Sequence, residues 1–456
     1  MSAWEEAGRA LAAGQTSLVS LWADGSRARL ALLSGPDVRI LDHAAPGGHF
    51  PSISRLHPPA LRLERALAES SALVPDGLPD TRPWLLHGAA AASYPFLPVK
   101  GAHLHQIPVG PVHAGIIEPG HFRFTCAGET IVRLEERLGY VHRGVEALME
   151  GKRPEEAAKI AARISGDSTV AYAIAFARAV ESALGVAPPP RALWLASLMA
   201  ELERLANHLG DFGAICNDAA FALMLSHCGI LRERVLRASF FCFGHRLMMD
   251  RILPGGAITD LSADGIAHLR ALVAEIGQKF PRLLSLYDRT ASLQDRTVGT
   301  GILRPDLAQL WAAGGFVGRA SGRDFDARRL YPPYDSLAFA TAVRSEGDVD
   351  ARLRIRAVEI MESLGLITQI LDRLPSGPIR SALPDGAGEG FALIEGFRGD
   401  IFLHVRLEGG RIARCHARDP SWFQWPLLEA AIAGNIVADF PICNKSFNCS
   451  YAGHDL

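Results

Sequence analysis

The chain has 456 residues, of which 48% are hydrophobic and 21% charged, and its net charge is −2. This length predicts two or three domains, or one large domain with an appendage, with ample apolar material for a core. The near-neutral charge argues against a nucleic-acid binder, which usually carries a basic excess. No basic and apolar leader opens the chain, and no apolar run reaches about 18 residues, so we expect neither a signal peptide nor a transmembrane helix.

The seven cysteines are scattered, and no two are spaced as Cys-x-x-Cys. An odd, scattered set without a secretion signal is typical of reduced, buried thiols rather than of disulfides or a zinc site. These residues are Cys126, Cys216, Cys228, Cys242, Cys415, Cys443 and Cys449.

The N-terminal part has the pattern of a small α/β module. Strand-like runs cover residues 17–25 and 28–33, and a helical segment covers residues 61–71. Residues 77–88 are rich in proline and glycine and predict an ordered loop. Residues 89–98, with small side chains and two prolines, then predict a boundary.

The next segment changes period twice. Apolar residues alternate around glycine and proline in residues 110–125, which predicts a β-hairpin with His113 at its tip. From Thr130 the spacing favours a helix, because four apolar residues fall on one helical face: Ile131, Leu134, Leu138 and Val141. Pro154 and two glutamates then open a further helix that reaches Arg163.

Long helices dominate the rest of the chain. They are predicted at residues 191–209, 223–247, 266–285 and 348–374. Residues 390–418 predict a β-hairpin with a Gly-Gly turn, and a last helix at residues 425–432 precedes the tail. We therefore predict an α+β fold, in which a small α/β domain precedes a large central α-helical bundle domain with peripheral β-hairpins.

Three groups of polar residues are candidates for chemistry. His142 and Glu146 are four residues apart and would share a helical face, as a proton relay or merely as a surface ion pair. His113 is either a functional residue or a structural one. The irregular segment 314–334 is either an ordered interfacial loop or a solvated charge run. It carries Arg319, Arg323, Asp324, Asp326, Arg328 and Arg329.

Several motifs occur together and in order: Gly110-Pro-Val-His, His142-Arg-Gly-Val-Glu, Glu201-Leu-Glu-Arg-Leu-Ala-Asn-His, Pro254-Gly-Gly and Gly318-Arg-Ala-Ser-Gly-Arg-Asp. Through them the chain, from about residue 98 to its end, resembles the large subunit of membrane-bound (group 4, formate hydrogenlyase-type) nickel–iron hydrogenases. It is also similar to the quinone-site subunit of complex I, which is lettered D. The beginning, with Phe50-Pro-Ser-Ile-Ser-Arg-Leu-His and Asp80-Thr-Arg-Pro-Trp-Leu-Leu-His-Gly, resembles the C-lettered subunit of complex I. The resemblance implies two domains, 1–95 and 96–456.

The same resemblance implies where a nickel–iron centre would lie. The family holds the metals with an Arg-x-Cys-Gly-x-Cys motif and a C-terminal Cys-x-x-Cys motif. Here the first motif is Arg163-Ile-Ser-Gly-Asp-Ser168, and the second pair falls on Ser450 and Gly453. A serine hydroxyl cannot replace a soft bridging thiolate. We therefore expect no metal site and no nickel–iron centre, and hydrogenase activity is not expected.

What remains is the role of the quinone-site subunit of complex I. The resemblance implies a cavity for a quinone or another acceptor, beside an iron–sulphur cluster in a partner subunit. His113 matches the quinone-contacting histidine, and Gly166 stands where the family has a second contact, a tyrosine. Arg143 and Glu146 match the Arg-Gly-x-Glu motif, whose glutamate passes protons in the hydrogenases, and Asp167 is a candidate proton donor or coupling acid. We expect the acceptor to meet Ser165, Gly166, Ser168, Ser450 and Gly453 together with His113.

The implied protein is an oxidoreductase subunit of the NADH:quinone oxidoreductase or hydrogenase-like type. It would lie peripherally on the cytoplasmic side of the inner (plasma) membrane and couple electron transfer to proton or ion translocation. The implied partners are a small iron–sulphur subunit, like the one lettered B in complex I, and membrane subunits of the complex I or antiporter type. The alternatives are a redox-silent coupling scaffold and a hydrogenase large subunit with a degenerate metal site.

Overall fold

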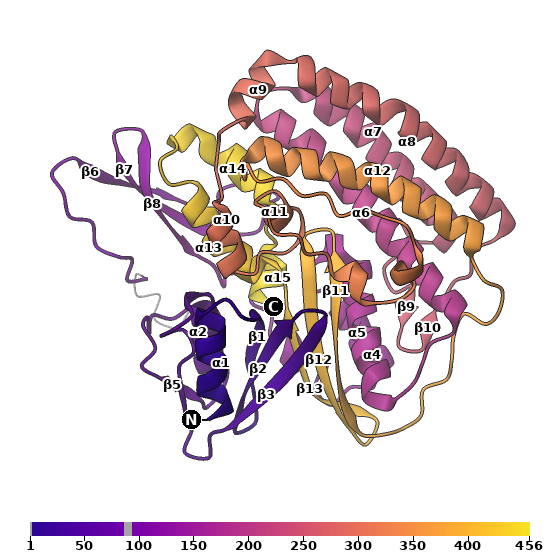
Figure 1. Ribbon diagram of the computed structural model, residues 1–456, viewed down its shortest axis with the longest axis horizontal. Helices are drawn as coiled ribbons and strands as arrows, with labels where there is room; N and C mark the ends of the chain where they lie inside the picture. The colour runs from indigo at the N-terminus through magenta and orange to yellow at the C-terminus, as the bar shows by residue number, and fades with distance from the viewer. Residues whose placement is uncertain (1, 86–93) are drawn as a thin grey trace.

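The computed structural model describes residues 2–85 and 94–456 (Figure 1). The predicted loop at 77–88 and the predicted boundary at 89–98 fall partly on residues 86–93, which lie outside the described residues. The α+β prediction is confirmed. The division of the chain near residue 95 stays a prediction.

An antiparallel meander, ordered β1-β2-β3, and two helices form the beginning of the chain (Figure 1). The predicted strands and helix are present, while α1 and β3 were not predicted. The start of α1 had a local signal, because Ser2 and Glu5 form a reciprocal capping box. The elements are α1 (Ala3–Ala12), β1 (Ser17–Asp24), β2 (Arg27–Ser34), β3 (Asp37–Ala44), β4 (His49–Pro51), η1 (Pro58–Ala60), α2 (Leu61–Ser70) and β5 (Val74–Asp76).

A second antiparallel sheet consists of β6 (Leu104–Val109), β7 (His121–Ala127) and β8 (Thr130–Arg137). The predicted hairpin is present, and its connecting loop carries His113. The helix predicted from Thr130 is wrong, because this segment pairs along β7 as β8. Short apolar runs do not distinguish strand from helix by period alone, and pairing with β7 decides for strand.

His142 lies between the end of β8 at Arg137 and the start of α3 at Val145. Gly144 takes a left-handed conformation (φ 63°) and starts a short helix, α3 (Val145–Met149). His142 therefore precedes the helix that carries Glu146. The prediction that the two side chains share a helical face is wrong.

Long helices form the bulk of the molecule, as predicted. The buried α6 (Pro190–Asp218) packs against α7 (Ala222–Phe243) and α12 (Val349–Arg373), and α8 (Ala263–Arg289) covers α7 and α12 (Figure 1). The smaller elements in this part are α4 (Pro154–Ala161), η2 (Gly166–Ser168), α5 (Thr169–Leu184), β9 (Ile252–Leu253), β10 (Gly256–Ala257), α9 (Ala291–Thr297), α10 (Pro305–Leu310), α11 (Gly315–Arg319), η3 (Ala327–Leu330) and η4 (Tyr334–Ser336).

The predicted C-terminal hairpin is a three-stranded antiparallel sheet, β11 (Gly388–Gly396), β12 (Gly399–Glu408) and β13 (Arg411–Arg418). Its two faces bury different partners, because side chains alternate along a strand. Leu403 lies in the main core with α5, whereas Phe402 packs against Trp22 of β1. Gly390 permits the contact with α5, since a Cβ there would lie 2.3 Å from the Ala179 carbonyl oxygen.

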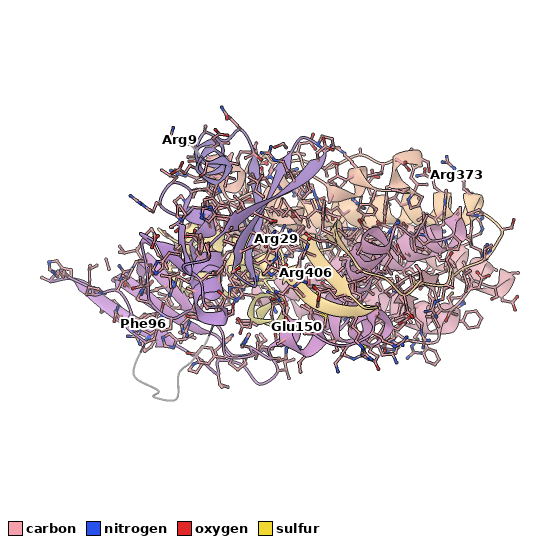
Figure 2. The ribbon with its side chains drawn as sticks, turned by 90° about the horizontal axis from the view of Figure 1, so that it is seen from below. Arg9, Arg29, Phe96, Glu150, Arg373 and Arg406 are labelled. Carbon is pink, nitrogen blue, oxygen red and sulfur yellow. The ribbon has the colours of Figure 1, made fainter. Side chains whose placement is uncertain are left out.

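The N-terminal meander is tied to this sheet by polar contacts as well. Arg406 pairs with Asp24 at 3.0 Å, and Arg29 lies in the same interface (Figure 2). The Ser20 hydroxyl and His416 Nε2 are 2.7 Å apart. The beginning of the chain is therefore packed on β12 and β13.

The tail folds back into the molecule as α13 (Ser421–Ala431), η5 (Val437–Asp439), α14 (Phe440–Phe447) and α15 (Tyr451–Asp455), and every residue of α15 is buried. All seven cysteines are buried and free, so the prediction of buried thiols is confirmed. Within the described ranges, none of the helices combines the length and the apolar character that crossing a membrane requires.

Candidate functional site

Two segments that lie far apart in sequence meet at the start of α15. The hydroxyl oxygens of Ser165 and Ser450 are 2.8 Å apart, and both side chains are buried. Ser165 donates its proton to Asp167 at 2.9 Å, so the Ser450 hydroxyl donates to Ser165. The Ser450 oxygen also accepts from the Gly453 amide at 2.9 Å and so caps α15. A hydrogen bond between hydroxyls thus joins two segments that the resemblance aligns with the two cysteine motifs.

An ion pair lies beside the two serines. Arg398, on the turn between β11 and β12, binds both carboxylate oxygens of Asp167, at 2.7 and 2.5 Å. It also donates to the hydroxyl of Ser168 at 3.3 Å and to the Asn448 carbonyl. Burial opposes ionisation of Asp167, but the Arg398 guanidinium holds the pKa of this carboxyl below its usual value. Arg398 was not among the predicted site residues.

A second acid lies where α5 begins. Glu203 of α6 accepts hydrogen bonds from the amides of Val170 and Ala171, at 2.7 and 3.1 Å. Burial raises the pKa of Glu203 to about 8 and outweighs these two bonds, with a further contribution from the charge of Asp167. Glu203 therefore keeps its proton at neutral pH. Its position in Glu201-Leu-Glu-Arg was visible in the sequence, but only the contact with α5 sets it apart.

The two glycines of the candidate site differ in the space around them. A Cβ at Gly166 would meet no atom within 4 Å, so the backbone is open on this side. A Cβ at Gly453 would lie 2.4 Å from a carboxylate oxygen of Asp419. That carboxylate is fixed by Tyr172, whose hydroxyl donates to it at 2.6 Å, and by the Ser421 amide at 2.8 Å.

The residues present therefore do not fit a nickel–iron centre. At the positions that the resemblance aligns with the four thiolates, the hydroxyls of Ser165 and Ser450 bond each other, and the Ser168 hydroxyl accepts from Arg398. Asp419 takes the space that a side chain at Gly453 would need. In the described part of the chain, no three histidine, cysteine, aspartate or glutamate side chains gather in a way that would hold a metal ion.

Arg143 and His113 both contact the α15 region. Arg143 donates to the Ile164 carbonyl at 2.7 Å and to the Ala452 carbonyl at 3.3 Å, so it links the two serine segments. His113 Nε2 is 3.3 Å from the Tyr451 hydroxyl. In the same hairpin loop, Glu118 accepts from the Ala452 amide at 3.0 Å. The structure thus brings His113, Arg143 and the serine segments to one place.

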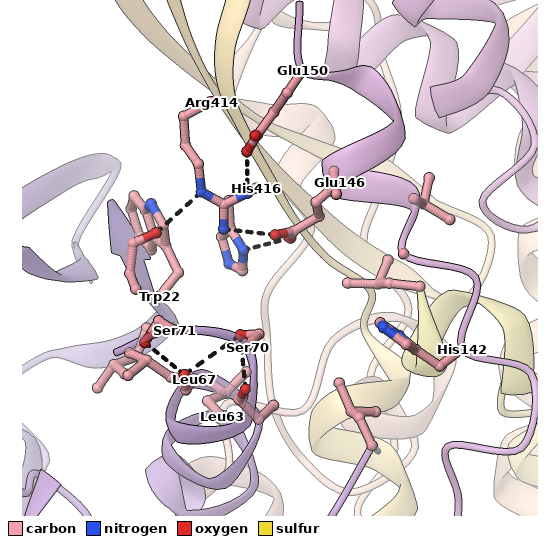
Figure 3. A pocket seen from close by; sticks show the side chains of 18 of the residues that line it. Trp22, Leu63, Leu67, Ser70, Ser71, His142, Glu146, Glu150, Arg414 and His416 are labelled. Carbon is pink, nitrogen blue, oxygen red and sulfur yellow. Dashed lines mark hydrogen bonds and ion pairs between the residues drawn. The ribbon is translucent and has the colours of Figure 1, made fainter. Parts of the chain in front are cut away.

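Glu146 lies elsewhere. Its carboxylate accepts from Arg414 at 2.7 Å and the Ala417 amide at 3.0 Å, and is 2.8 Å from His416 Nδ1, all on β13 (Figure 3). Burial opposes its ionisation, but Arg414 and His416 hold the pKa of Glu146 far below its usual value. It borders a cavity of about 470 Å³ between α2, β1 and β13. His142 Nδ1 instead meets the Asp455 carbonyl at 2.7 Å, so a His142–Glu146 relay is not formed.

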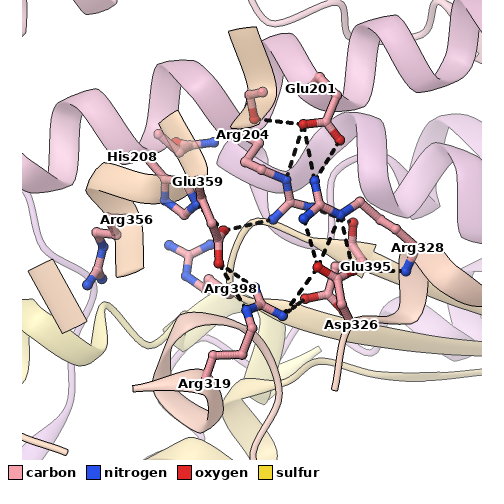
Figure 4. Close-up of polar contacts among 12 residues, drawn as sticks. Glu201, Arg204, His208, Arg319, Asp326, Arg328, Arg356, Glu359, Glu395 and Arg398 are labelled. Carbon is pink, nitrogen blue, oxygen red and sulfur yellow. Dashed lines mark hydrogen bonds and ion pairs between the residues drawn. The ribbon is translucent and has the colours of Figure 1, made fainter. Parts of the chain in front are cut away.

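The charged loop is largely a buried element. Arg319, Asp326 and Arg328 are each at most 2% exposed, so the solvated-run alternative is wrong for them. They join a cluster of opposite charges on α6, α12 and β11 (Figure 4). Asp324 and Arg329, which pair with each other at 3.2 Å, are exposed. The other members of the cluster are Glu201, Arg204, His208, Glu359 and Glu395.

Two family models match the chain. Residues 219–385 match "Respiratory-chain NADH dehydrogenase, 49 Kd subunit", and residues 143–216 match "Nickel-dependent hydrogenase". Together the two matches place the part of the chain from residue 143 to residue 385 in a class that includes subunits of nickel-dependent hydrogenases and of the respiratory NADH dehydrogenase.

Two similar proteins show the family to which the chain belongs. Formate hydrogenlyase subunit 5 of Escherichia coli (strain K12) is 30% identical over an alignment of 439 positions, which covers 89% of this chain and 77% of the relative. The D-lettered subunit of NADH-quinone oxidoreductase from Dehalococcoides mccartyi (strain CBDB1) is 30% identical, covering 73% of this chain and 92% of the relative. The chain belongs to this family of oxidoreductase subunits.

A solved structure has the same fold. It is a chain of the membrane-bound sulfane sulfur reductase, an archaeal respiratory membrane complex, with a TM-score of 0.73 and 25% identity. The match covers 78% of this chain and 99% of that one. These relatives are subunits of membrane-bound respiratory or hydrogenase-related complexes.

Proposed function

We propose that this subunit serves a membrane-bound, complex I-related oxidoreductase without nickel–iron chemistry, and that an organic acceptor, with a quinone as our first candidate, docks beside His113 and Gly166. The observation that carries the proposal is the hydrogen-bonded Ser165–Ser450 pair beside the Asp167–Arg398 ion pair. These groups occupy the place of the metal site with proton-exchanging and charged side chains.

Each residue of the proposed acceptor site would have a separate role in quinone reduction. His113 and Tyr451 offer hydrogen-bonding groups 3.3 Å apart for a quinone oxygen, and Gly166 adds no side chain that would narrow the site. Reduction of a quinone to a quinol takes up two electrons and two protons. The electrons would come from an iron–sulphur cluster of a small partner subunit. Glu203 holds a proton next to Asp167, and Arg398 balances the charge of that carboxylate.

The location follows from the same proposal. The subunit would lie on the cytoplasmic side of the membrane, against membrane subunits of the complex I or antiporter type. Val112 and Ile116 of the His113 loop are 76% and 99% exposed. Exposed apolar side chains next to the site are consistent with a partner subunit that completes it.

A redox-silent coupling scaffold is the second candidate. One observation favours it: Asp167 is held by Arg398 and Ser165, so the polar groups of the former metal site are satisfied without any ligand. Binding of a quinone analogue to the assembled complex separates the two candidates, because a scaffold would bind none in this region.

Nickel analysis tests the loss of the metal centre. We expect the protein, purified from cells grown with nickel, to contain no stoichiometric nickel, because hydroxyls and Asp419 occupy the ligand positions. The measurement is elemental analysis of the complex, with a nickel–iron hydrogenase prepared in parallel as the positive control. Stoichiometric nickel that disappears in Ser165→Ala would refute the proposal.

Replacement of His113 tests the acceptor site. We expect His113→Ala to slow reduction of a quinone analogue by the assembled complex about tenfold, which corresponds to one lost hydrogen bond of about 1.4 kcal/mol. His105→Ala is the matched control, because His105 is an exposed residue of the same hairpin. Equal turnover of the two variants and the wild type would place the acceptor elsewhere.

A further inference from the structure

A second cavity lies at the C-terminal end of α5, away from the site described above. Its volume is about 640 Å³, within the range of small-molecule sites. α5, which begins beside Asp167, runs along β11 toward it (Figure 1). Its walls are the turn between β2 and β3, the end of α5, the connection to α6 with the first turn of α6, the segment around Tyr331 and the middle of β11. Its apolar lining includes Val38, Val186, Pro188, Leu193, Leu330 and Phe391.

Two charged side chains on successive turns of α5 line this cavity with incomplete contacts. The Glu181 side chain is 4% exposed, and its Oε1 accepts from the Gly255 amide at 2.9 Å. Its Oε2 has no hydrogen-bond partner among the described residues. Arg178 is 24% exposed, and its contacts are long: 3.4 Å to the Pro332 carbonyl and 3.9 Å to Glu181. A buried polar group without a partner is costly, so this pair is incomplete in the chain alone.

The charges of Glu181 and Arg178 determine which kind of ligand this cavity would bind. Burial raises the pKa of Glu181 to about 7, against the opposing effects of the Gly255 amide and Arg178. Burial also lowers the pKa of Arg178, which stays charged because free arginine titrates above about 12. Tyr331 faces Arg178 from the opposite wall, and the exposed Asp37 lies at the rim. Below about pH 7, the Glu181 carboxyl is therefore neutral, and the Arg178 guanidinium leaves this part of the cavity with a net positive charge.

We propose that this cavity binds a small organic monocarboxylate with an apolar aryl or alkyl body. The Arg178 guanidinium matches a carboxylate in charge and in its forked geometry. Protonation of Glu181 removes a negative charge that would repel this carboxylate, and the apolar body packs against Leu193 and Phe391. The site is independent of the proposed function, since it shares no residue with the serine segments. It lies roughly 14–18 Å along α5 from Thr169, at 1.5 Å per residue.

Benzoate titration of the purified full-length protein tests the proposal, with calorimetry at pH 6 and pH 8. We expect saturable binding at pH 6 that weakens about tenfold at pH 8, because a group with a pKa near 7 is then about nine-tenths deprotonated. Acetate, which lacks the apolar body, should bind at least about tenfold more weakly than benzoate. If folded wild-type protein shows no saturable benzoate binding at either pH, the proposal is wrong.

Two variants separate the roles of the pair. Arg178→Gln should abolish binding, and Arg178→Lys should retain part of it. Glu181→Gln should bind at both pH values with equal affinity, because the amide carries no charge at either pH. The control is Arg270→Gln, which removes an exposed arginine paired with Asp372. Unchanged benzoate affinity in a folded Arg178→Gln protein would overturn the assignment.

Discussion

Replacement of Arg398 by methionine is expected to destabilise the protein by about 2–3 kcal/mol. Removing one partner of a buried ion pair costs about 3–5 kcal/mol, and exposure of the other partner reduces this value. Arg398 has a side-chain exposure of 6%, whereas Asp167 is 39% exposed. The same change leaves the Ser168 hydroxyl and the Asn448 carbonyl without their donor. Urea unfolding at pH 7 measures the effect.

The double variant Arg398→Met with Asp167→Asn is the control. It removes the unpaired charge, so we expect it to recover part of the lost stability. The pH dependence gives a second readout. Arg398 lowers the pKa of Asp167, so its stabilising effect is present above the ordinary value and is lost as pH falls through the folded-state pKa. A single variant as stable as the wild type would show that this ion pair does not organise the site.

Replacement of Glu359 by glutamine is expected to lower the free energy of unfolding by about 4 kcal/mol. This is a larger effect than the one expected for Arg398→Met. The Glu359 carboxylate is 4% exposed and binds Arg319 through two bonds, at 3.0 and 2.7 Å. It also lies 2.7 Å from His208 and 3.4 Å from Arg204 (Figure 4). The neutral amide would leave two buried guanidinium groups with too little negative charge.

Glu362→Gln on the same helix is the matched control, because Glu362 is half-buried and outside the cluster. We expect its urea midpoint to equal that of the wild type. In wild-type protein Arg319, with His208 and Arg204, holds the pKa of Glu359 well below its usual value, against burial. The cluster should therefore be strongest above the ordinary carboxyl range and weaken only in acid. Equal midpoints for Glu359→Gln and Glu362→Gln would contradict this account.

The cluster is the reason why much of the loop at residues 314–334 is buried despite its charges. Its charges look like those of a solvated segment, and local sequence does not reveal which arginines face a carboxylate. Arg319 and Arg328 are buried because α6, α12 and β11 supply Glu201, Glu359 and Glu395. Asp324 and Arg329, from the same stretch, remain exposed.

The sequence by itself determined the helical part of the fold and the family. The helices α6, α7, α8 and α12 follow from their apolar periodicity, which the central bundle requires. The order of the motifs identified the family, and the absence of paired cysteines was readable at once. The glycine and proline residues, flanked by alternating apolar residues, also predicted the hairpin that carries His113.

Only the tertiary structure decided how the candidate site is built. β8 is a strand because β7 pairs with it, and Glu146 faces β13 because α3 starts after a left-handed Gly144. Arg398 reaches Asp167 across 231 positions of sequence, and Asp419 takes the space beside Gly453. No local pattern encodes such contacts, because they depend on packing between segments that are neighbours only in the folded chain.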